Sequence, residues 1–147
     1  MPGVIDTNLL LYAVNTDAEE NDAARAFLTQ AANSVDQWYI SEGGLYEFFR
    51  VATHPRVFPH PLTWRQALAF LKPMLASPRF RILSAGDNPW EVLETLLSGL
   101  THPSGNLFYD IRTVALMKEH GIRKIYTADT DFLQFQDIEV INPLRPL

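Results

Sequence analysis

Short apolar runs alternate with amphipathic segments along the whole chain, and this alternation restricts the fold more than any other feature of the sequence. The runs are typical of buried strands, and they lie at residues 4–5, 38–40, 80–83, 124–127 and 140–141. The segments between them have helical spacing, at residues 9–12, 17–32, 41–52, 63–75, 88–99 and 107–120. Strands that alternate with helices form a parallel sheet with helices packed on it. We therefore expect an α/β fold, and a length of 147 residues suits a single domain over residues 1–147.

Polar residues predict where several of the helices begin. Ser41 is expected to be an N-cap, and Thr63 with Gln66 matches a capping box. Asn88 followed by Pro89 predicts an N-cap with proline at the first helical position. These residues divide the chain into strand and helix units without a linker or a repeat.

The composition excludes several classes of protein. The chain has no cysteine, which removes disulfides, thiol catalysis and cysteine-ligated zinc. It contains no serine-hydrolase elbow, P-loop or dinucleotide fingerprint. No apolar run approaches membrane-spanning length, and the N-terminus lacks the pattern of a signal peptide. We therefore expect a cytoplasmic protein without a membrane partner.

Four acidic residues stand where spare charge is not expected. Asp6 ends the first strand, and Asp129 follows the strand at 124–127. Glu47 borders the apolar face of its helix, and Asp110 lies early in another helix. In parallel α/β sheets, ligand sites lie outside the carboxyl ends of the strands. Because both strand ends and both helix starts belong to that edge, we expect the four carboxylates to converge on one cleft.

Each of these acids taken alone also has a simpler explanation. Asp129 can be the N-cap of the next helix, and Glu47 can form a surface ion pair with Arg50. Gathered carboxylates, however, repel one another until some are protonated or a cation neutralises them. Oxygen ligands without cysteine indicate Mg²⁺ or Mn²⁺ rather than zinc. Together with Asp131, the four acids carry as much charge as the whole chain, whose formal net charge is −5.

Basic residues gather in a stretch of the chain, residues 48–86, that contains no Asp or Glu. This stretch holds six of the twelve Lys and Arg residues. Two interpretations stay open: scattered solvated side chains, or a basic surface that holds phosphates despite the negative net charge.

The acidic motifs, taken in order, are Val4-Ile-Asp-Thr-Asn-Leu-Leu-Leu-Tyr12, the Glu47 helix that ends Phe49-Arg-Val51, Gly105-Asn-Leu-Phe-Tyr-Asp110 and Tyr126-Thr-Ala-Asp-Thr-Asp-Phe132, followed by Ile141-Asn-Pro143. In this order and spacing the chain resembles PIN-domain ribonucleases, and among them the VapC-type toxins of bacterial toxin–antitoxin pairs. The resemblance covers essentially the whole chain. One departure is Tyr109, where many relatives have histidine.

The resemblance implies a three-layer α/β/α sandwich with a central, mainly parallel sheet. It implies an acidic cluster that binds Mg²⁺ or Mn²⁺ and hydrolyses RNA phosphodiester bonds. It also implies a homodimer and a small cognate antitoxin whose tail blocks the cleft. By motif position, the expected catalytic and metal-binding residues are Asp6, Glu47, Asp110 and Asp129, and the expected auxiliary residues are Asn8, Thr127 and Asp131.

The basic stretch then becomes a candidate RNA-binding surface, represented by Arg50, Arg56 and Arg79. Two alternatives to a ribonuclease stay open. A haloacid-dehalogenase-type phosphatase needs a second aspartate two residues after the first, where this chain has Asn8. A catalytically silent PIN module acting as an interaction partner has no need to keep four mutually repelling acids.

Overall fold

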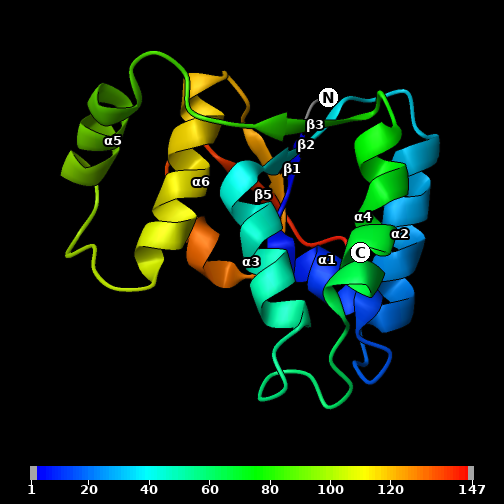
Figure 1. Ribbon diagram of the computed structural model, residues 1–147. Coiled ribbons are helices and arrows are strands. Elements are labelled where there is room, and N and C mark those ends of the chain that lie inside the picture. Colours follow the sequence, from blue (N-terminus) through cyan, green and yellow to red (C-terminus); the bar gives the residue numbers. More distant parts are fainter. Residues whose placement is uncertain (1–2, 146–147) are drawn as a thin grey trace.

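The computed structural model describes residues 3–145, and a five-stranded sheet lies at its centre (Figure 1). The strands are β1 (Gly3–Ile5), β2 (Trp38–Ser41), β3 (Phe80–Leu83), β4 (Lys124–Tyr126) and β5 (Glu139–Ile141). Their order is β3-β2-β1-β4-β5, and every neighbouring pair is parallel. The predicted parallel sheet is confirmed. Because β1 is the central strand, Asp6 lies in the middle of the carboxyl edge.

Helices cover both faces of the sheet. They are α1 (Thr7–Val14), α2 (Asn21–Asn33), α3 (Glu42–Ala52), α4 (Trp64–Ala76), α5 (Pro89–Ser98), α6 (Leu107–Glu119) and the 3₁₀ helix η1 (Thr130–Gln134). Helices α1 to α4 pack around one hydrophobic core, whereas α5, α6 and η1 pack around another (Figure 1). The expected three-layer α/β/α architecture is therefore confirmed. No helix within residues 3–145 is long and apolar enough to cross a membrane.

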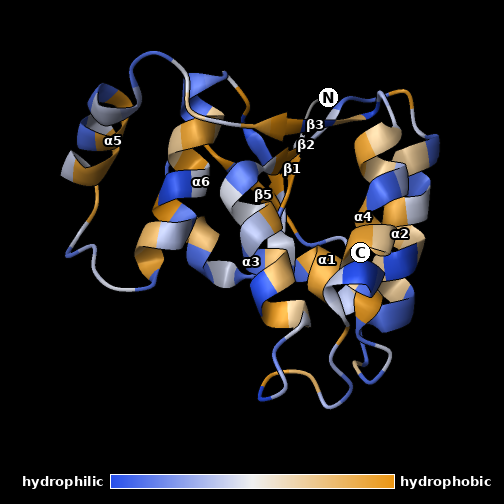
Figure 2. Ribbon diagram, viewed as in Figure 1, coloured by the Kyte–Doolittle hydropathy of each residue, from blue (hydrophilic) through white to orange (hydrophobic). Residues whose placement is uncertain are grey.

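The strands supply side chains to both cores in alternation. On β1, Ile5 belongs to the core of α1 to α4, and Val4 belongs to the core of α5 and α6. On β2, Ile40 and Tyr39 divide in the same way. Successive residues of a strand point to opposite faces, and here both faces are covered. This explains why the strands appear in the sequence as short continuous apolar runs, and Figure 2 shows them as hydrophobic ribbons between mixed helices.

The predicted helix starts are largely confirmed. The Ser41 hydroxyl accepts a hydrogen bond of 3.0 Å from the backbone of Gly44, and both bonds of the Thr63–Gln66 capping box are present. The prediction for Asn88 is wrong in one respect, because its side chain makes no capping hydrogen bond. Its backbone (φ −127°, ψ 53°) lies outside the extended region that N-cap residues adopt.

Two further predictions from the pattern are wrong. The helix expected at residues 17–32 begins only at Asn21, because Asn15 accepts a hydrogen bond from the backbone of Asp17 and closes a turn there. The spacing of the apolar residues also predicts that Trp38, Trp64 and Trp90 belong to the core, but Trp64 and Trp90 are 56% and 77% exposed. Both lie in the first turn of their helices. The apolar spacing of the helix includes this turn, but the turn extends beyond the hydrophobic core.

Candidate active site

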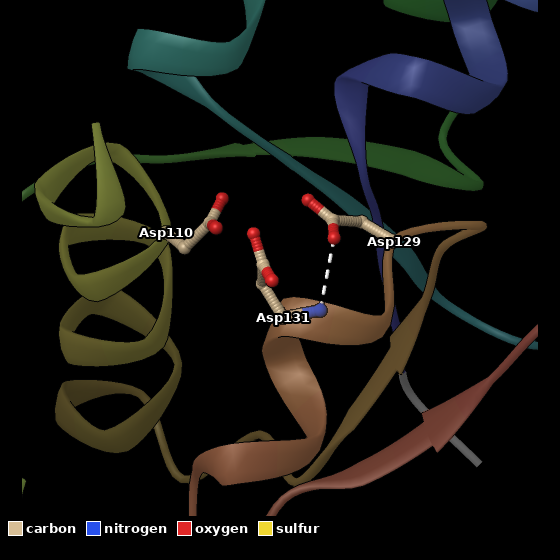
Figure 3. Close-up of side chains that lie close together, drawn as sticks. All are labelled: Asp110, Asp129 and Asp131. Atoms are coloured by element: carbon tan, nitrogen blue, oxygen red, sulfur yellow. Dashed lines mark hydrogen bonds between the residues drawn. The ribbon is translucent and has the colours of Figure 1, made fainter.

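Three aspartates point toward one another at the carboxyl edge of the sheet (Figure 3). Asp110 comes from the first turn of α6, Asp129 directly precedes η1, and Asp131 lies in its first turn. One carboxylate oxygen from each residue lies within 4.8 Å of the other two. Carboxylate oxygens are the ligands that hard divalent cations prefer, and this spacing lets one cation contact all three side chains. The donor set therefore fits the predicted Mg²⁺ or Mn²⁺.

A buried hydroxyl connects Asp6 to this group. The side chain of Thr127 is 1% exposed, and its Oγ1 donates a hydrogen bond of 2.7 Å to Oδ2 of Asp6. The same oxygen accepts a bond of 2.9 Å from the backbone N–H of Asp129. The other oxygen of Asp6 accepts a bond of 2.8 Å from the backbone of Thr7. Asp6 and Asp129 follow different strands, and Thr127 fixes one relative to the other.

Asn8 completes this hydrogen-bonded chain and leaves one acceptor unused. Its Nδ2 donates to Oγ1 of Thr127 at 3.2 Å. Because the single hydroxyl proton of Thr127 goes to Asp6, the hydroxyl must accept from Asn8, and this fixes the orientation of the amide. Oδ1 of Asn8 is buried, and no group within residues 3–145 donates a hydrogen bond to it. An unpaired buried acceptor beside carboxylates is a further oxygen that suits a cation or a water molecule.

Glu47 reaches the aspartates because α1 and α3 approach each other closely. The Thr7 hydroxyl donates to the backbone carbonyl of Gly44 at 3.1 Å. A Cβ atom on Gly44 would lie only 2.7 Å from the Thr7 hydroxyl, so glycine is needed at this contact. One turn later on α3, Glu47 lines a cavity of about 270 Å³ together with Asp110, Asp129 and Asp131.

Crowding and burial change the acidity of the carboxyl groups. The pKa of Asp110 is raised to about 7. Burial is the largest cause, and the negative charges of Asp6, Asp129, Asp131 and Glu47 add to it. The other four acids therefore all act on Asp110 by charge, which agrees with the convergence that we expected from the sequence.

The pKa of Asp6 is raised to about 6, chiefly by burial, while the hydrogen bonds from Thr127 and Thr7 act in the opposite direction. The pKa of Glu47 is also raised by burial, and the positive charge of Arg50 offsets part of that effect. Near neutral pH Asp110 is therefore close to the midpoint between its protonated and its ionised form.

The simpler explanations hold in part. Asp129 does cap η1, because its Oδ1 accepts a hydrogen bond of 2.9 Å from the backbone of Asp131. This cap turns the Asp131 side chain toward the cluster instead of removing Asp129 from it (Figure 3). The alternative explanation for Glu47 is wrong, because it forms no ion pair with Arg50 within residues 3–145, and the two side chains interact only through longer-range charge.

The three arginines predicted to bind RNA do not lie together. Arg50 lines the carboxylate cavity. Arg56 lies in the loop between α3 and α4, which extends away from the sheet in Figure 1. Arg79 directly precedes β3, at the amino edge of the sheet, and donates to the backbone carbonyl of Val35 at 3.0 Å. RNA binding by Arg56 and Arg79 stays a prediction, at places separate from the carboxylates.

Sequence reasoning missed one arginine close to the site. Arg112 lies on α6, two residues after Asp110, and lines a second cavity next to the carboxylates. It stands outside the acid-free stretch that drew attention to the other arginines. Helical spacing gave the usable signal, since Arg112 is three residues from Tyr109 and shares its helix face.

The comparison with known families agrees with this geometry. A family model described as the PIN domain matches residues 3–138. The chain belongs to the PIN-domain family. Among curated PIN-domain relatives, Ribonuclease VapC33 of Mycobacterium tuberculosis is 33% identical over 140 residues, which are 95% of this chain and 96% of that protein. Ribonuclease VapC48 of the same organism is 27% identical over 143 residues, which are 97% and 98% of the two chains.

Solved structures share the PIN fold. VapBC2 from Rickettsia felis, bound to a DNA fragment from its promoter, superposes with a TM-score of 0.67 at 18% identity and covers 97% of this chain and 98% of that chain. The sarcin–ricin-loop-cleaving toxin VapC20 of Mycobacterium tuberculosis superposes with a TM-score of 0.61 at 20% identity and covers 93% of this chain and 98% of that one. The family resemblance seen in the sequence motifs is thereby confirmed.

Proposed function

We propose that this protein is a metal-dependent endoribonuclease and the toxin of a VapBC-type toxin–antitoxin pair. The observation that carries the proposal is the cluster in which oxygens of Asp110, Asp129 and Asp131 lie within 4.8 Å of one another, with Asp6 and Glu47 acting on it by charge. Similarity along nearly the full length of Ribonuclease VapC33 supports RNA as the substrate.

The metal in this proposal is Mg²⁺ or Mn²⁺. A bound divalent cation would lower the pKa of a coordinated water molecule, and it would neutralise the charge that develops on a phosphate during in-line attack. Asp6, Glu47, Asp110 and Asp129 are the proposed catalytic and metal-binding residues. The proposed auxiliary residues are Asn8, Thr127 and Asp131.

The residues of the chain divide the remaining work. Thr127 holds Asp6 by a hydrogen bond and favours its ionised form, because the bond lowers the pKa of that carboxyl group. Asp110, whose pKa is about 7, would have to give up its proton in order to hold the cation. Asn8 offers its unpaired Oδ1 as an acceptor for a bound water molecule or as a ligand for the cation.

The proposed partners follow from the relatives. Similar structures include VapBC2 from Rickettsia felis bound to a promoter DNA fragment, DNA-bound VapBC from Salmonella typhimurium and a toxin–antitoxin complex from Klebsiella pneumoniae. We infer that a cognate antitoxin binds this chain as well and that the toxin is a homodimer. Cleavage of cellular RNA places the proposed activity in the cytoplasm.

Cleavage of a mixed pool of structured RNA by the purified protein tests this function. We expect cleavage with Mn²⁺ or Mg²⁺, none with EDTA, and none by Asp110→Asn under any of these conditions. Asp22→Asn, an equal change at an exposed position on α2, should cut like the wild type. Cleavage that persists in EDTA, or in Asp110→Asn, would contradict the proposed site. A wild-type protein that binds metal but cuts no RNA would instead support the silent interaction module.

A further inference from the structure

A second cavity of about 370 Å³ opens beside the carboxylates, between the first halves of α3 and α6. Glu47, Arg50 and Tyr109 line both this cavity and the one that contains the aspartates, so the two are adjacent. Tyr46 from α3 and Arg112 from α6 belong to the part of the wall that is not shared. We call this second cavity the flanking pocket.

The flanking pocket carries two positive charges, from Arg50 and Arg112, and one negative charge, from Glu47. The side chains of Arg50 and Arg112 are exposed, and within residues 3–145 neither guanidinium donates a hydrogen bond or forms an ion pair. Glu47 lines both this pocket and the neighbouring cavity, and its charge interacts with that of Arg50. One carboxylate beside two guanidinium groups leaves a net positive charge for an anion that comes from outside the chain.

The position of Arg112 strengthens this argument. Its guanidinium lies against the first turn of α3, where a Cβ atom on Gly43 would collide with Nη1. The N-terminal end of a helix carries partial positive charge, so a cation placed there is unfavourable on its own. An anion that enters the flanking pocket and contacts the guanidinium would offset this repulsion. Glycine at position 43 leaves the space that the guanidinium itself occupies.

Aromatic rings stand beside the arginines. Tyr46 and Tyr109 are 72% and 64% exposed, although each lines the flanking pocket. Proteins that bind single-stranded nucleic acids commonly place exposed rings next to guanidinium groups. Unstacked bases lie on the rings while the phosphates contact arginine. In a paired helix the bases stack on one another and cannot reach such rings.

We propose that the flanking pocket binds the nucleotide next to the scissile phosphate. Arg112 and Arg50 contact the phosphate of that nucleotide, and Tyr109 or Tyr46 stacks on its base. This assignment extends the proposed ribonuclease function and depends on it for the identity of the ligand. It gives Arg112 a substrate-positioning role that is separate from the metal cluster.

Binding of RNA measured without cleavage tests the proposal. The probe is a fluorescent, random-sequence, unpaired RNA of about 12 nucleotides, followed by anisotropy in EDTA and again with Mg²⁺ on ice. Arg112→Gln should lower the affinity about tenfold, and it should reduce the slope of log K against log salt by about 0.7. Arg25→Gln, at an exposed position on α2, is the matched control and should change neither quantity.

A second pair of variants tests the stacking. Tyr109→Ala should lower the affinity about fivefold or more, whereas Tyr109→Phe keeps the ring and should bind like the wild type. The same RNA annealed to its complement should bind more weakly than the single strand. Equal affinity of Arg112→Gln and the wild type, or a preference for the duplex, would overturn the flanking pocket.

The outcomes separate this proposal from the proposed enzyme activity. If Arg112→Gln loses affinity but the wild type cuts no RNA, the flanking pocket stands and the ribonuclease function falls. If the wild type cuts RNA and Arg112→Gln has the same KM, the ribonuclease stands and the flanking pocket falls. A wild-type protein that binds no unpaired RNA with or without Mg²⁺ contradicts both the pocket and its ligand.

Discussion

The hydroxyl of Thr127 donates a hydrogen bond of 2.7 Å to the carboxylate of Asp6 across 121 residues of sequence. It joins the end of β4 to the end of β1, and the same oxygen accepts from the backbone of Asp129. Two acids that follow different strands are thus held at a fixed separation by one buried side chain.

Replacing that hydroxyl should weaken the metal site without touching a proposed ligand. We expect Thr127→Val to lower Mn²⁺ affinity about 10- to 100-fold, as losses of groups that orient ligands usually do. It should also lower the free energy of unfolding by about 1–3 kcal/mol, because the buried Asp6 oxygen and Asn8 amide lose their partner. Calorimetric titration and denaturant unfolding measure the two effects. Thr127→Ser keeps the hydroxyl and should restore most of the affinity; equal weakening in both variants would point to packing instead.

The stability of the metal-free protein should fall as the pH rises. Asp6 and Asp110 have an ordinary pKa of 3.8 when unfolded and pKa values of about 6 and about 7 when folded. The folded state therefore binds protons more tightly, so this contribution is fully present below about pH 4 and is lost as the pH passes 6 and 7. Allowing for screening at the half-exposed Asp110, we expect the loss to be about 2–3 kcal/mol.

Denaturant melts in EDTA across this pH range measure the loss. Asp110→Asn has no carboxyl group to titrate at that position and should show a shallower decline than the wild type. A wild-type stability that stays level or rises between about pH 4 and pH 8, with no difference from Asp110→Asn, would mean that folding does not raise the pKa values of these carboxyl groups.

A divalent cation should reverse this loss. At a concentration one hundred times its Kd, Mn²⁺ or Mg²⁺ should add about 2.7 kcal/mol to the free energy of unfolding. For a chain of this size the melting temperature should rise by roughly 5–10 °C. Thermal melts with each metal and with EDTA measure the shift. Asp110→Asn should be slightly more stable than the wild type without metal, because one repelling charge is gone, and should lose most of the shift. No shift in the wild type with either metal would count against the site.

The glycine at the contact between α1 and α3 should be irreplaceable. A Cβ atom at position 44 would lie 2.7 Å from the Thr7 hydroxyl and 2.9 Å from the Ser41 hydroxyl. We expect Gly44→Ala to cost about 1–3 kcal/mol of stability and to displace Glu47 from the cluster. Gly99→Ala is the control, since its Cβ would meet only the Leu96 carbonyl at an ordinary 3.6 Å. Unfolding and Mn²⁺ titration of both variants decide the matter, and equal behaviour would remove the steric role of Gly44.

Much of the fold could be predicted because the strands are buried on both faces. Val4 and Ile5 enter different cores, so both must be apolar, and a continuous apolar run marks the strand. The acids could be found for a related reason, since Asp6 and Asp129 stand directly after such runs. Asp6 and Asp129 can act together because both lie at the carboxyl edge of the sheet, and the sequence shows where each strand ends at that edge.

Other features depend on distances that local patterns do not contain. The acid-free stretch is continuous in the sequence, but α4 carries it from the carboxyl edge back to the amino edge, so Arg79 and Arg50 are separated. Helical spacing does not show which turns of a helix extend beyond the core, and for this reason the predicted burial of Trp64 and Trp90 is wrong. The contact of Arg112 with Gly43 arises from the separation of α3 and α6, which only the folded chain defines.

The wall that Glu47, Arg50 and Tyr109 provide to both cavities has a thermodynamic consequence. A ligand in either cavity changes the field and the side-chain positions that a ligand in the other one meets. Such coupling is reciprocal: the factor by which a cation changes the affinity for RNA is the factor by which RNA changes the affinity for the cation. An RNA that fits the flanking pocket would then raise the affinity of the site for the cation. The rate of cleavage would depend on how well the RNA fits as much as on the free concentration of metal.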